Sequence, residues 1–284
     1  MRIVSLVPAG TEIVCALGAG DELVGVTHDC DYPAWTQRLP RVTRSTIASG
    51  STSAEIDAQV RDAAARNEST FHLDAAALAE LRPDLIVGQT LCAVCAVTLE
   101  QLPASLDPAP PVVPLTGASL DGVFADVERA AIALGRARVG TELVGALRAR
   151  LAAVTERVAA RRRPRVVCLE WTDPLFNAGH WVPEQVDLAG GHDVLGEPGV
   201  PSRVIEWADV RAAEPEALFV MPCGFGRERA ARETQALRAL PGWDHLPAVR
   251  DGRVHAVDGN AYFSRPGPRV VDGVELLASL LHRT

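Results

Sequence analysis

Short apolar runs alternate with helical patterns along the chain, and this alternation restricts the possible folds more than any other feature. The first four runs lie at residues 3–7, 23–26, 85–87 and 112–115. Helical patterns separate them at residues 11–17, 74–81 and 92–102. Parallel strands need crossover connections, usually helices, whereas antiparallel strands can be joined by tight turns. The alternation therefore predicts a parallel α/β sheet.

A long amphipathic segment separates this part of the chain from a second set of apolar runs. Between residues 121 and 161, apolar residues recur at steps of three and four with Arg and Glu between them, which is typical of a helix with one apolar face. Pro164 ends this helix. The later runs lie at residues 166–169, 218–221 and 254–257, and helical patterns lie near residues 184–190, 206–213, 227–239 and 268–281.

The sequence thus predicts an α/β fold with two parallel-sheet lobes joined by one long linking helix. We expect an N-terminal lobe at residues 1–117, linking helices at 118–163 and a C-terminal lobe at 164–284. An internal similarity supports two related lobes, because residues 81–87 and 213–220 each combine a helix end, a proline beside an acid, and an apolar strand. Ligands of such sheets bind beyond the carboxyl ends of the strands, so we expect a ligand-binding cleft.

The charge balance and the apolar pattern exclude some classes of partner. The formal net charge is −8, which argues against nucleic-acid binding because that needs a surplus of basic residues. No apolar run approaches the roughly 20 residues that a membrane span needs. Because residues 3–7 are already expected to form a strand, we read no secretory leader and expect a cytoplasmic protein.

Three segments near the N-terminus resemble one family. Residues 3–12, residues 23–26 with 31–33, and residues 82–87 resemble the class III periplasmic-binding-protein-like family, which serves importers of iron-siderophores, haem and vitamin B12. Among these proteins, the chain most resembles the cobalamin-binding proteins. The resemblance implies two lobes with a ligand in the cleft, binding without turnover, and an ABC permease as partner. It also implies that Tyr32 packs against the corrin ring.

Aromatic residues gather in the segments that follow the predicted strands, although only 5% of the chain is aromatic. Broad planar ligands are held by aromatic side chains, with a few polar groups that fix their orientation. An alternative is that half of these rings belong to the ordinary core. The predicted ligand-binding residues are Tyr32, Gln89, Trp171, Phe176, Trp181, Phe225 and Tyr262.

A second set of residues has the chemistry of soft-metal ligands. Cys92 and Cys95 form a C-x-x-C pattern at an expected helix start, where the helix dipole lowers the pKa of a thiol. His28 and Cys30 follow the neighbouring strand, so the four residues could hold zinc or another soft metal. Two alternatives stay open: the four residues line the cleft without a metal, or Cys92 and Cys95 form a redox pair.

No catalytic motif accompanies the acids and histidines of the second lobe. Glu170, Asp173, His180 and Glu206 occur without a nucleophile elbow, a zincin helix or a phosphate-binding loop. Polar groups in such a cleft serve more often as hydrogen-bond partners for a ligand. We therefore expect a binding protein and not an enzyme.

The resemblance also implies one docking glutamate in each lobe for the Arg residues of a permease. The position in the first lobe falls on Ala93 and Val94, which are not acidic. In the second lobe, Glu206 and Asp209 lie near the equivalent place without a clean match. The acids that would dock this chain on an ABC permease are therefore not clearly present.

Three hypotheses for the function stay open. The first is a cytoplasmic receptor that holds a cobalamin-like corrinoid, or another small-molecule metal complex, in the cleft between the lobes. The second is a cytoplasmic thiol-dependent metal-binding protein or cofactor-handling enzyme that uses Cys30, Cys92, Cys95 and His28. The third is an extracytoplasmic importer component whose leader is encoded upstream, and a basic-apolar leader in the upstream DNA would support it.

Overall fold

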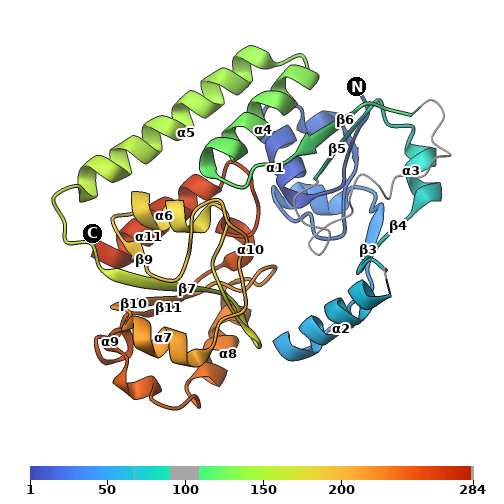
Figure 1. Cartoon of the computed structure of the whole chain (residues 1–284). Coiled ribbons are helices and arrows are strands. Elements are labelled where there is room, and N and C mark those ends of the chain that lie inside the picture. The colour runs from blue at the N-terminus through green and yellow to red at the C-terminus, as the bar shows by residue number, and fades with distance from the viewer. Residues whose placement is uncertain (67, 90–108, 283–284) are drawn as a thin grey trace. The chain divides into compact units, whose positions relative to one another are not determined.

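The computed structural model describes residues 1–66, 68–89 and 109–282 and divides into two compact units (Figure 1). Each unit has a main β-sheet of its own. The segment between the two sheets belongs partly to each unit, and the expected domain boundaries stay a prediction. The first unit comprises Met1–Gly117 and Asp121–Ala146, and the second unit comprises Ala118–Leu120 and Leu147–Thr284.

The first unit is built on a four-stranded parallel sheet in the order β2-β1-β5-β6. Ile3 pairs with Leu23 on one side and with Leu85 on the other, so β1 lies inside the sheet. All residues of β1 and β5 are buried, as is usual for parallel strands that are covered on both faces. The strands are β1 (Ile3–Ser5), β2 (Leu23–Gly25), β5 (Leu85–Gln89) and β6 (Val112–Leu115).

Helices pack on this sheet, and a separate two-stranded sheet belongs to the same unit. Helix α1 contacts β1 and β5, and it starts at Pro8, where the fixed φ angle of proline suits the first helical turn. The antiparallel strands β3 and β4, which pair Thr43 with Leu73, flank α2 in the sequence. The elements are α1 (Pro8–Ala16), η1 (Gly20–Glu22), η2 (Ala34–Arg38), β3 (Thr43–Ser45), α2 (Ser53–Ala65), β4 (Phe71–Leu73), α3 (Ala75–Leu81) and α4 (Leu120–Ala133).

The second unit has a mixed sheet in the order β11-β10-β7-β8, with β9 also paired to β7. Strands β9, β7, β10 and β11 are parallel, whereas β8 runs antiparallel to β7 and places Phe176 opposite Trp171. On the other edge of β8, Val204 forms a β-bridge with Phe176. The strands are β7 (Arg165–Thr172), β8 (Leu175–Asn177), β9 (His192–Asp193), β10 (Ala217–Val220) and β11 (Val254–Ala256).

Helices lie on both faces of this second sheet. Figure 1 shows α6 and α11 on one face and α7, α8 and α9 on the other. Leu218 and Val220 of the central strand β10 pack with Val210 of α7 and Trp243 in one buried core. The helices are α6 (Val182–Leu188), α7 (Trp207–Ala213), α8 (Arg227–Leu237), η4 (Trp243–His245), α9 (Pro247–Arg250), α10 (Gly259–Tyr262) and α11 (Val270–His282).

The longest helix of the described residues is α5 (Ala137–Val158), where the sequence predicts a long amphipathic helix. Its apolar face is buried through Leu147, Leu151 and Val154, which are spaced three and four residues apart. On the polar side, Arg150 forms ion pairs with two acids of α11. Among the described residues, no helix has both the length and the apolar content to cross a lipid bilayer.

The internal similarity of the sequence corresponds to a connection that occurs once in each unit. Helix α3 ends at Leu81 and α7 at Ala213, and the next residues, Arg82 and Glu214, adopt left-handed φ angles of 43° and 44°. A proline follows in each case, which prevents the helix from continuing. The buried strands β5 and β10 then begin, so the same local signals produce a central strand in both sheets.

Candidate ligand-binding site

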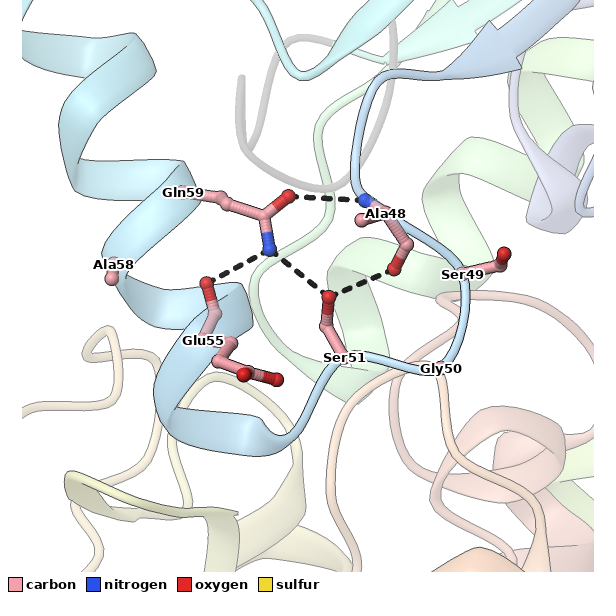
Figure 2. Close-up of a pocket in the computed structure, with 7 residues that line it drawn as sticks. All are labelled: Ala48, Ser49, Gly50, Ser51, Glu55, Ala58 and Gln59. Atoms are coloured by element: carbon pink, nitrogen blue, oxygen red, sulfur yellow. Dashed lines mark hydrogen bonds between the residues drawn. The ribbon is translucent and has the colours of Figure 1, made fainter.

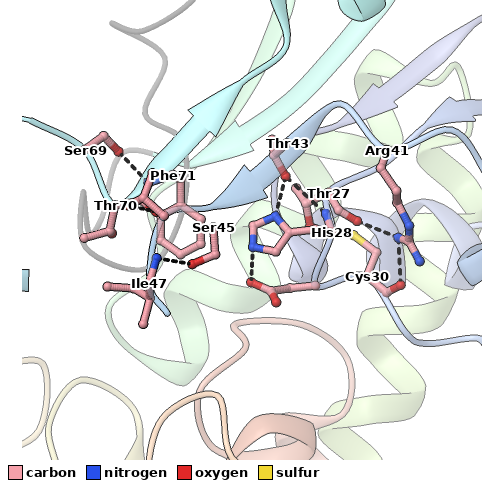
Figure 3. Close-up of polar contacts among 12 residues, drawn as sticks. Thr27, His28, Cys30, Arg41, Thr43, Ser45, Ile47, Ser69, Thr70 and Phe71 are labelled. Atoms are coloured by element: carbon pink, nitrogen blue, oxygen red, sulfur yellow. Dashed lines mark hydrogen bonds and ion pairs between the residues drawn. The ribbon is translucent and has the colours of Figure 1, made fainter. Parts of the chain in front are cut away.

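The segment after β2 carries His28 and Cys30 beyond the carboxyl end of that strand (Figure 3). Arg41 holds this segment in place, because its guanidinium donates to the carbonyl oxygens of Thr27 (2.5 Å) and Cys30 (3.0 Å). The segment is therefore fixed by side-chain-to-backbone hydrogen bonds of the first unit.

The side chains of His28 and Cys30 each have partners close by. The Sγ atom of Cys30 is buried and lies 3.0 Å from the hydroxyl of Thr11 and 3.1 Å from that of Thr27. His28 Nδ1 lies 2.7 Å from the Thr43 hydroxyl, and its Nε2 lies 3.4 Å from a carboxylate oxygen of Asp29. These contacts satisfy the thiol and the Nδ1 atom of the imidazole without a metal ion.

The structure therefore describes only two of the four predicted metal ligands, His28 and Cys30. Cys92 and Cys95 lie outside the described residues, as does the helix expected at residues 92–102. Within the described ranges, no group of three or more His, Cys, Asp or Glu side chains is placed to hold a metal ion. A zinc site with His28 and Cys30 stays a prediction.

Substitution of Cys30 distinguishes a hydrogen-bonded thiol from a metal ligand. Cys30→Ala is expected to lower the free energy of unfolding by about 1–2 kcal/mol, because the hydroxyls of Thr11 and Thr27 lose a buried partner. Cys30→Ser keeps a hydrogen-bonding group and is expected to lose less. Urea denaturation measures both values. Equal losses in the two variants, together with one equivalent of a soft metal in the unchanged protein, would instead support the metal site.

Two further predicted site residues belong to the first unit. Tyr32 follows Cys30 by two positions, and 47% of its surface is exposed. Gln89 is the last residue of β5 and is buried. Both therefore lie at or after the carboxyl end of a parallel strand, which is the edge where α/β sheets bind ligands.

In the second unit, three of the predicted residues form an aromatic cluster, which consists of Trp171, Phe176 and Phe225. The rings of Trp171 and Phe225 are tilted with centroids 5.1 Å apart, and Phe176 faces Trp171 across the β7–β8 pair. The indole N–H of Trp171 donates to the carbonyl oxygen of Asp173, 3.1 Å away. Trp171 and Phe176 are partly exposed, so the cluster presents aromatic surface at the end of β7.

The remaining two predicted residues lie elsewhere in this unit. Trp181 precedes α6 and is only 4% exposed, so little of its ring is open to a ligand. Tyr262 ends α10 and is partly exposed, with its ring edge against Phe263 and the guanidinium of Arg269 6.0 Å from its centroid.

A buried carboxyl group belongs to the residue that precedes the aromatic cluster on β7. Glu170 precedes Trp171 on β7, and its Oε1 accepts a hydrogen bond from the N–H of Gly179 (3.3 Å). Burial, helped by the nearby Cys223 thiol, raises the pKa of Glu170 to about 8, against the effect of hydrogen bonds from Gly179 and Ser202. At neutral pH this carboxyl is mostly protonated and can donate a hydrogen bond.

A basic residue of this region was not among the predicted site residues. Arg229 on the first turn of α8 places its guanidinium carbon 3.5 Å from the centroid of the Phe225 ring. The sequence signal was a spacing of four residues from Phe225, which precedes α8, to Arg229 in its first turn, but a basic residue in a helical pattern usually faces solvent.

A polar hollow of about 510 Å³ lies between α2 and the loop that precedes it (Figure 2). Gln59 spans it: its Nε2 donates to Ser51 Oγ (3.1 Å) and to the Glu55 carbonyl oxygen (3.0 Å), and its Oε1 accepts from the N–H of Ala48 (3.0 Å). These hydrogen bonds hold the loop at residues 48–51 against α2. No predicted site residue lines the hollow.

Comparison with known proteins decides the family. The model of the family described as periplasmic binding protein matches residues 3–261. The chain belongs to this family. Since periplasmic binding proteins and the relatives below are binding proteins, the prediction of a protein that binds without turnover is confirmed.

Relatives of this periplasmic binding protein agree over nearly the whole chain. The Vitamin B12-binding protein of Vibrio cholerae is 24% identical over 282 residues, which cover 99% of this chain and 88% of the relative. An uncharacterized ABC transporter substrate-binding lipoprotein of Bacillus subtilis, YvrC, is 24% identical over 289 residues, which cover 99% of this chain and 80% of the relative.

Two solved structures confirm the predicted family and fold class. The periplasmic heme-binding protein RhuT from Roseiflexus sp. RS-1, in apo form, is 26% identical with a TM-score of 0.75, covering 99% of this chain and 98% of that one. The periplasmic Vitamin B12 binding protein BtuF of Vibrio cholerae is 25% identical with a TM-score of 0.71, covering 99% and 96%.

The prediction of a cytoplasmic location is wrong for this periplasmic binding protein. Both solved relatives are named periplasmic, and the Bacillus relative is named a lipoprotein. The error came from the argument that a strand at residues 3–7 leaves no place for a leader. Strand β1 does begin at Ile3, but the position of a first strand carries no information about a segment before it.

Proposed function

We propose that this protein binds a planar metal complex, a corrinoid or a porphyrin, as the substrate-binding component of an importer. The observation that carries the proposal is the aromatic cluster at the carboxyl end of β7, where Trp171 contacts Phe225 and faces Phe176. Partly exposed aromatic rings at this end of a sheet suit the face or edge of a flat macrocycle.

The names of the relatives support the same ligand class. One sequence relative and one solved relative are named for vitamin B12, and another solved relative is named for haem. A corrin and a porphyrin are both broad rings around a metal ion, so one aromatic surface could bind either. Tyr32 of the first unit is proposed as a further contact because of its exposed ring after β2.

An ABC permease is the proposed partner, because the Bacillus relative is named as an ABC transporter substrate-binding lipoprotein. Glu206 and Asp209 are the candidate docking acids of the second unit. Asp209 accepts a hydrogen bond from the Glu206 N–H (2.9 Å), so these acids also cap the start of α7.

Calorimetric titration with cobalamin, cobinamide and haem tests the ligand class. We expect at least one of them to bind with a dissociation constant in the micromolar range or below, which corresponds to about 8 kcal/mol or more. Zinc chloride alone serves as the comparison for the metal-binding hypothesis. Absence of heat with all three complexes, together with stoichiometric zinc binding, would contradict the proposal.

A further inference from the structure

Val204 lies beside Phe176, on the edge of β8 that does not pair with β7. The two residues form an antiparallel β-bridge. The N–H groups of Asn177 and Ile205 flank it, and they donate to carbonyl oxygens of the opposite segment at 3.2 and 2.9 Å. This pattern makes Phe176 and Val204 a non-hydrogen-bonded pair, in which the two side chains share one face and lie close together.

This shared face points away from the core of the second unit. The sequence neighbours Leu175 and Ile205 both belong to the buried core on the other face. Because side chains alternate between the two faces of a strand, Phe176 and Val204 point away from that core. Val204 is accordingly 51% exposed, and Phe176 is partly exposed.

Trp171 completes a row of three side chains across three neighbouring segments. It lies opposite Phe176, at a point where the register of the β7–β8 pair shifts. Residues directly opposite each other share a face, so Trp171, Phe176 and Val204 form one continuous apolar row. Adjacent strands lie about 4.8 Å apart, so the outer two members are separated by about 10 Å. This length is comparable to the width of a tetrapyrrole ring.

The side chains of the apolar row suit contact with hydrocarbon. Phenylalanine and valine carry no hydrogen-bonding group in their side chains. The indole N–H of Trp171 already donates to the carbonyl oxygen of Asp173 (3.1 Å). A polar ligand group that is buried on the row would therefore lose its hydration without a replacement, which is unfavourable.

We propose that Val204 is a specificity-determining contact and that the apolar row makes this protein prefer a porphyrin to a corrinoid. The inference rests on the proposed function and narrows its ligand class. The porphyrin of haem carries methyl and vinyl groups along much of its edge, and burial of these groups is favourable. Amide groups surround the corrin ring of cobalamin and of cobinamide, and the apolar row does not compensate their desolvation.

The test is calorimetric titration of the unchanged protein and of Val204→Asn with haem and with cobinamide. The unchanged protein is expected to bind haem at least about tenfold more tightly than cobinamide. Val204→Asn is expected to weaken the binding of haem about tenfold, because apolar contact is lost and the new amide must give up its hydration. The binding of cobinamide is expected to change less than about threefold.

A matched control and a second variant keep this test decisive. Val200→Asn makes the same change at a position that is 41% exposed but lies outside the apolar row, and it should leave both affinities nearly unchanged. Val204→Thr keeps the β-branched shape that suits a strand and replaces one methyl group by a hydroxyl. It is expected to weaken haem binding about threefold, even if Val204→Asn disturbs the β-bridge.

Three results would overturn the inference while the proposed function stands. They are equal or tighter binding of cobinamide by the unchanged protein, equal losses for haem and cobinamide in Val204→Asn, and unchanged haem binding in both variants of Val204. If the unchanged protein binds neither haem, cobinamide nor cobalamin, the proposed function itself fails and the inference fails with it.

Discussion

At about pH 9, the Glu170→Gln variant is expected to be more stable than the unchanged protein, with a free energy of unfolding about 2–4 kcal/mol higher. Burial raises the pKa of Glu170 from 4.5 to about 8 in the folded protein. Between these values the folded state holds a proton that the unfolded state has lost, so the contribution of Glu170 to stability falls as the pH rises. Glutamine has the shape of the carboxyl but no charge to bury.

The pH profile separates this effect from a simple change in packing. Urea denaturation at about pH 4 should show similar stabilities for both proteins, because Glu170 is then mostly protonated in both states. Asp193→Asn is the matched control, since burial raises the pKa of Asp193 to about 6 and its effect should be complete at a lower pH. A stability difference of Glu170→Gln that does not vary with pH would contradict the explanation.

The Trp171→Ala variant is expected to bind its metal complex more weakly by about 1–3 kcal/mol, because the largest ring of the aromatic cluster is removed. The change also deprives Phe225 and Phe176 of their neighbour. Calorimetry with the complex that the unchanged protein binds measures the loss. Tyr32→Ala in the first unit is expected to weaken binding by a similar amount.

Trp207→Ala provides the comparison for Trp171→Ala. Trp207 belongs to α7 and stacks on Trp243 with centroids 6.0 Å apart, on the face of the sheet that α7 covers. Its removal should reduce stability but leave the affinity nearly unchanged. An equal loss of affinity in both variants would show that general destabilisation, and not ring contact, explains the effect.

Much of the fold could be predicted because the inner strands are buried on both faces. Strands β1 and β5 each begin with consecutive apolar residues, Ile3 and Val4 in β1 and Leu85 to Val87 in β5, which marks them in the sequence without any tertiary information. The long helix α5 was equally clear, because its apolar face repeats over several turns. The proline after each left-handed residue, Arg82 and Glu214, marked where the connecting helices end.

Strands that depend on their partners were missed. Residues 175–177 were not among the expected strands, but Leu175 and Phe176 pair with the end of β7. The Asp173-Pro174 turn between two short runs rich in aromatic and aliphatic residues was an available signal. Strands β3 and β4 have only three residues each and are not fully buried, so no apolar pattern distinguishes them from a loop.

The sequence predicted where residues of the candidate site lie relative to the strands, but not the environment of their side chains. Sequence alone placed Trp171 and Phe225 after two strands of one sheet, and the structure brings their rings together. The environment of Glu170 and the stacking of Arg229 depend on distances between side chains, which no spacing in the sequence determines. The same is true of Cys30, whose threonine partners come from α1 and from its own loop.

The β-bridge between Val204 and Phe176 has a consequence for solubility. Strand β8 lies at the edge of the sheet and carries an aromatic residue, and exposed edges of this kind can recruit strands of other molecules into aggregates. The segment around Val204 occupies that edge, because the Ile205 N–H donates to the Leu175 carbonyl oxygen (2.9 Å) and the Asn177 N–H donates to the Arg203 carbonyl oxygen (3.2 Å). The protein can thus keep an aromatic surface open to a ligand while the backbone beside it is closed to self-association.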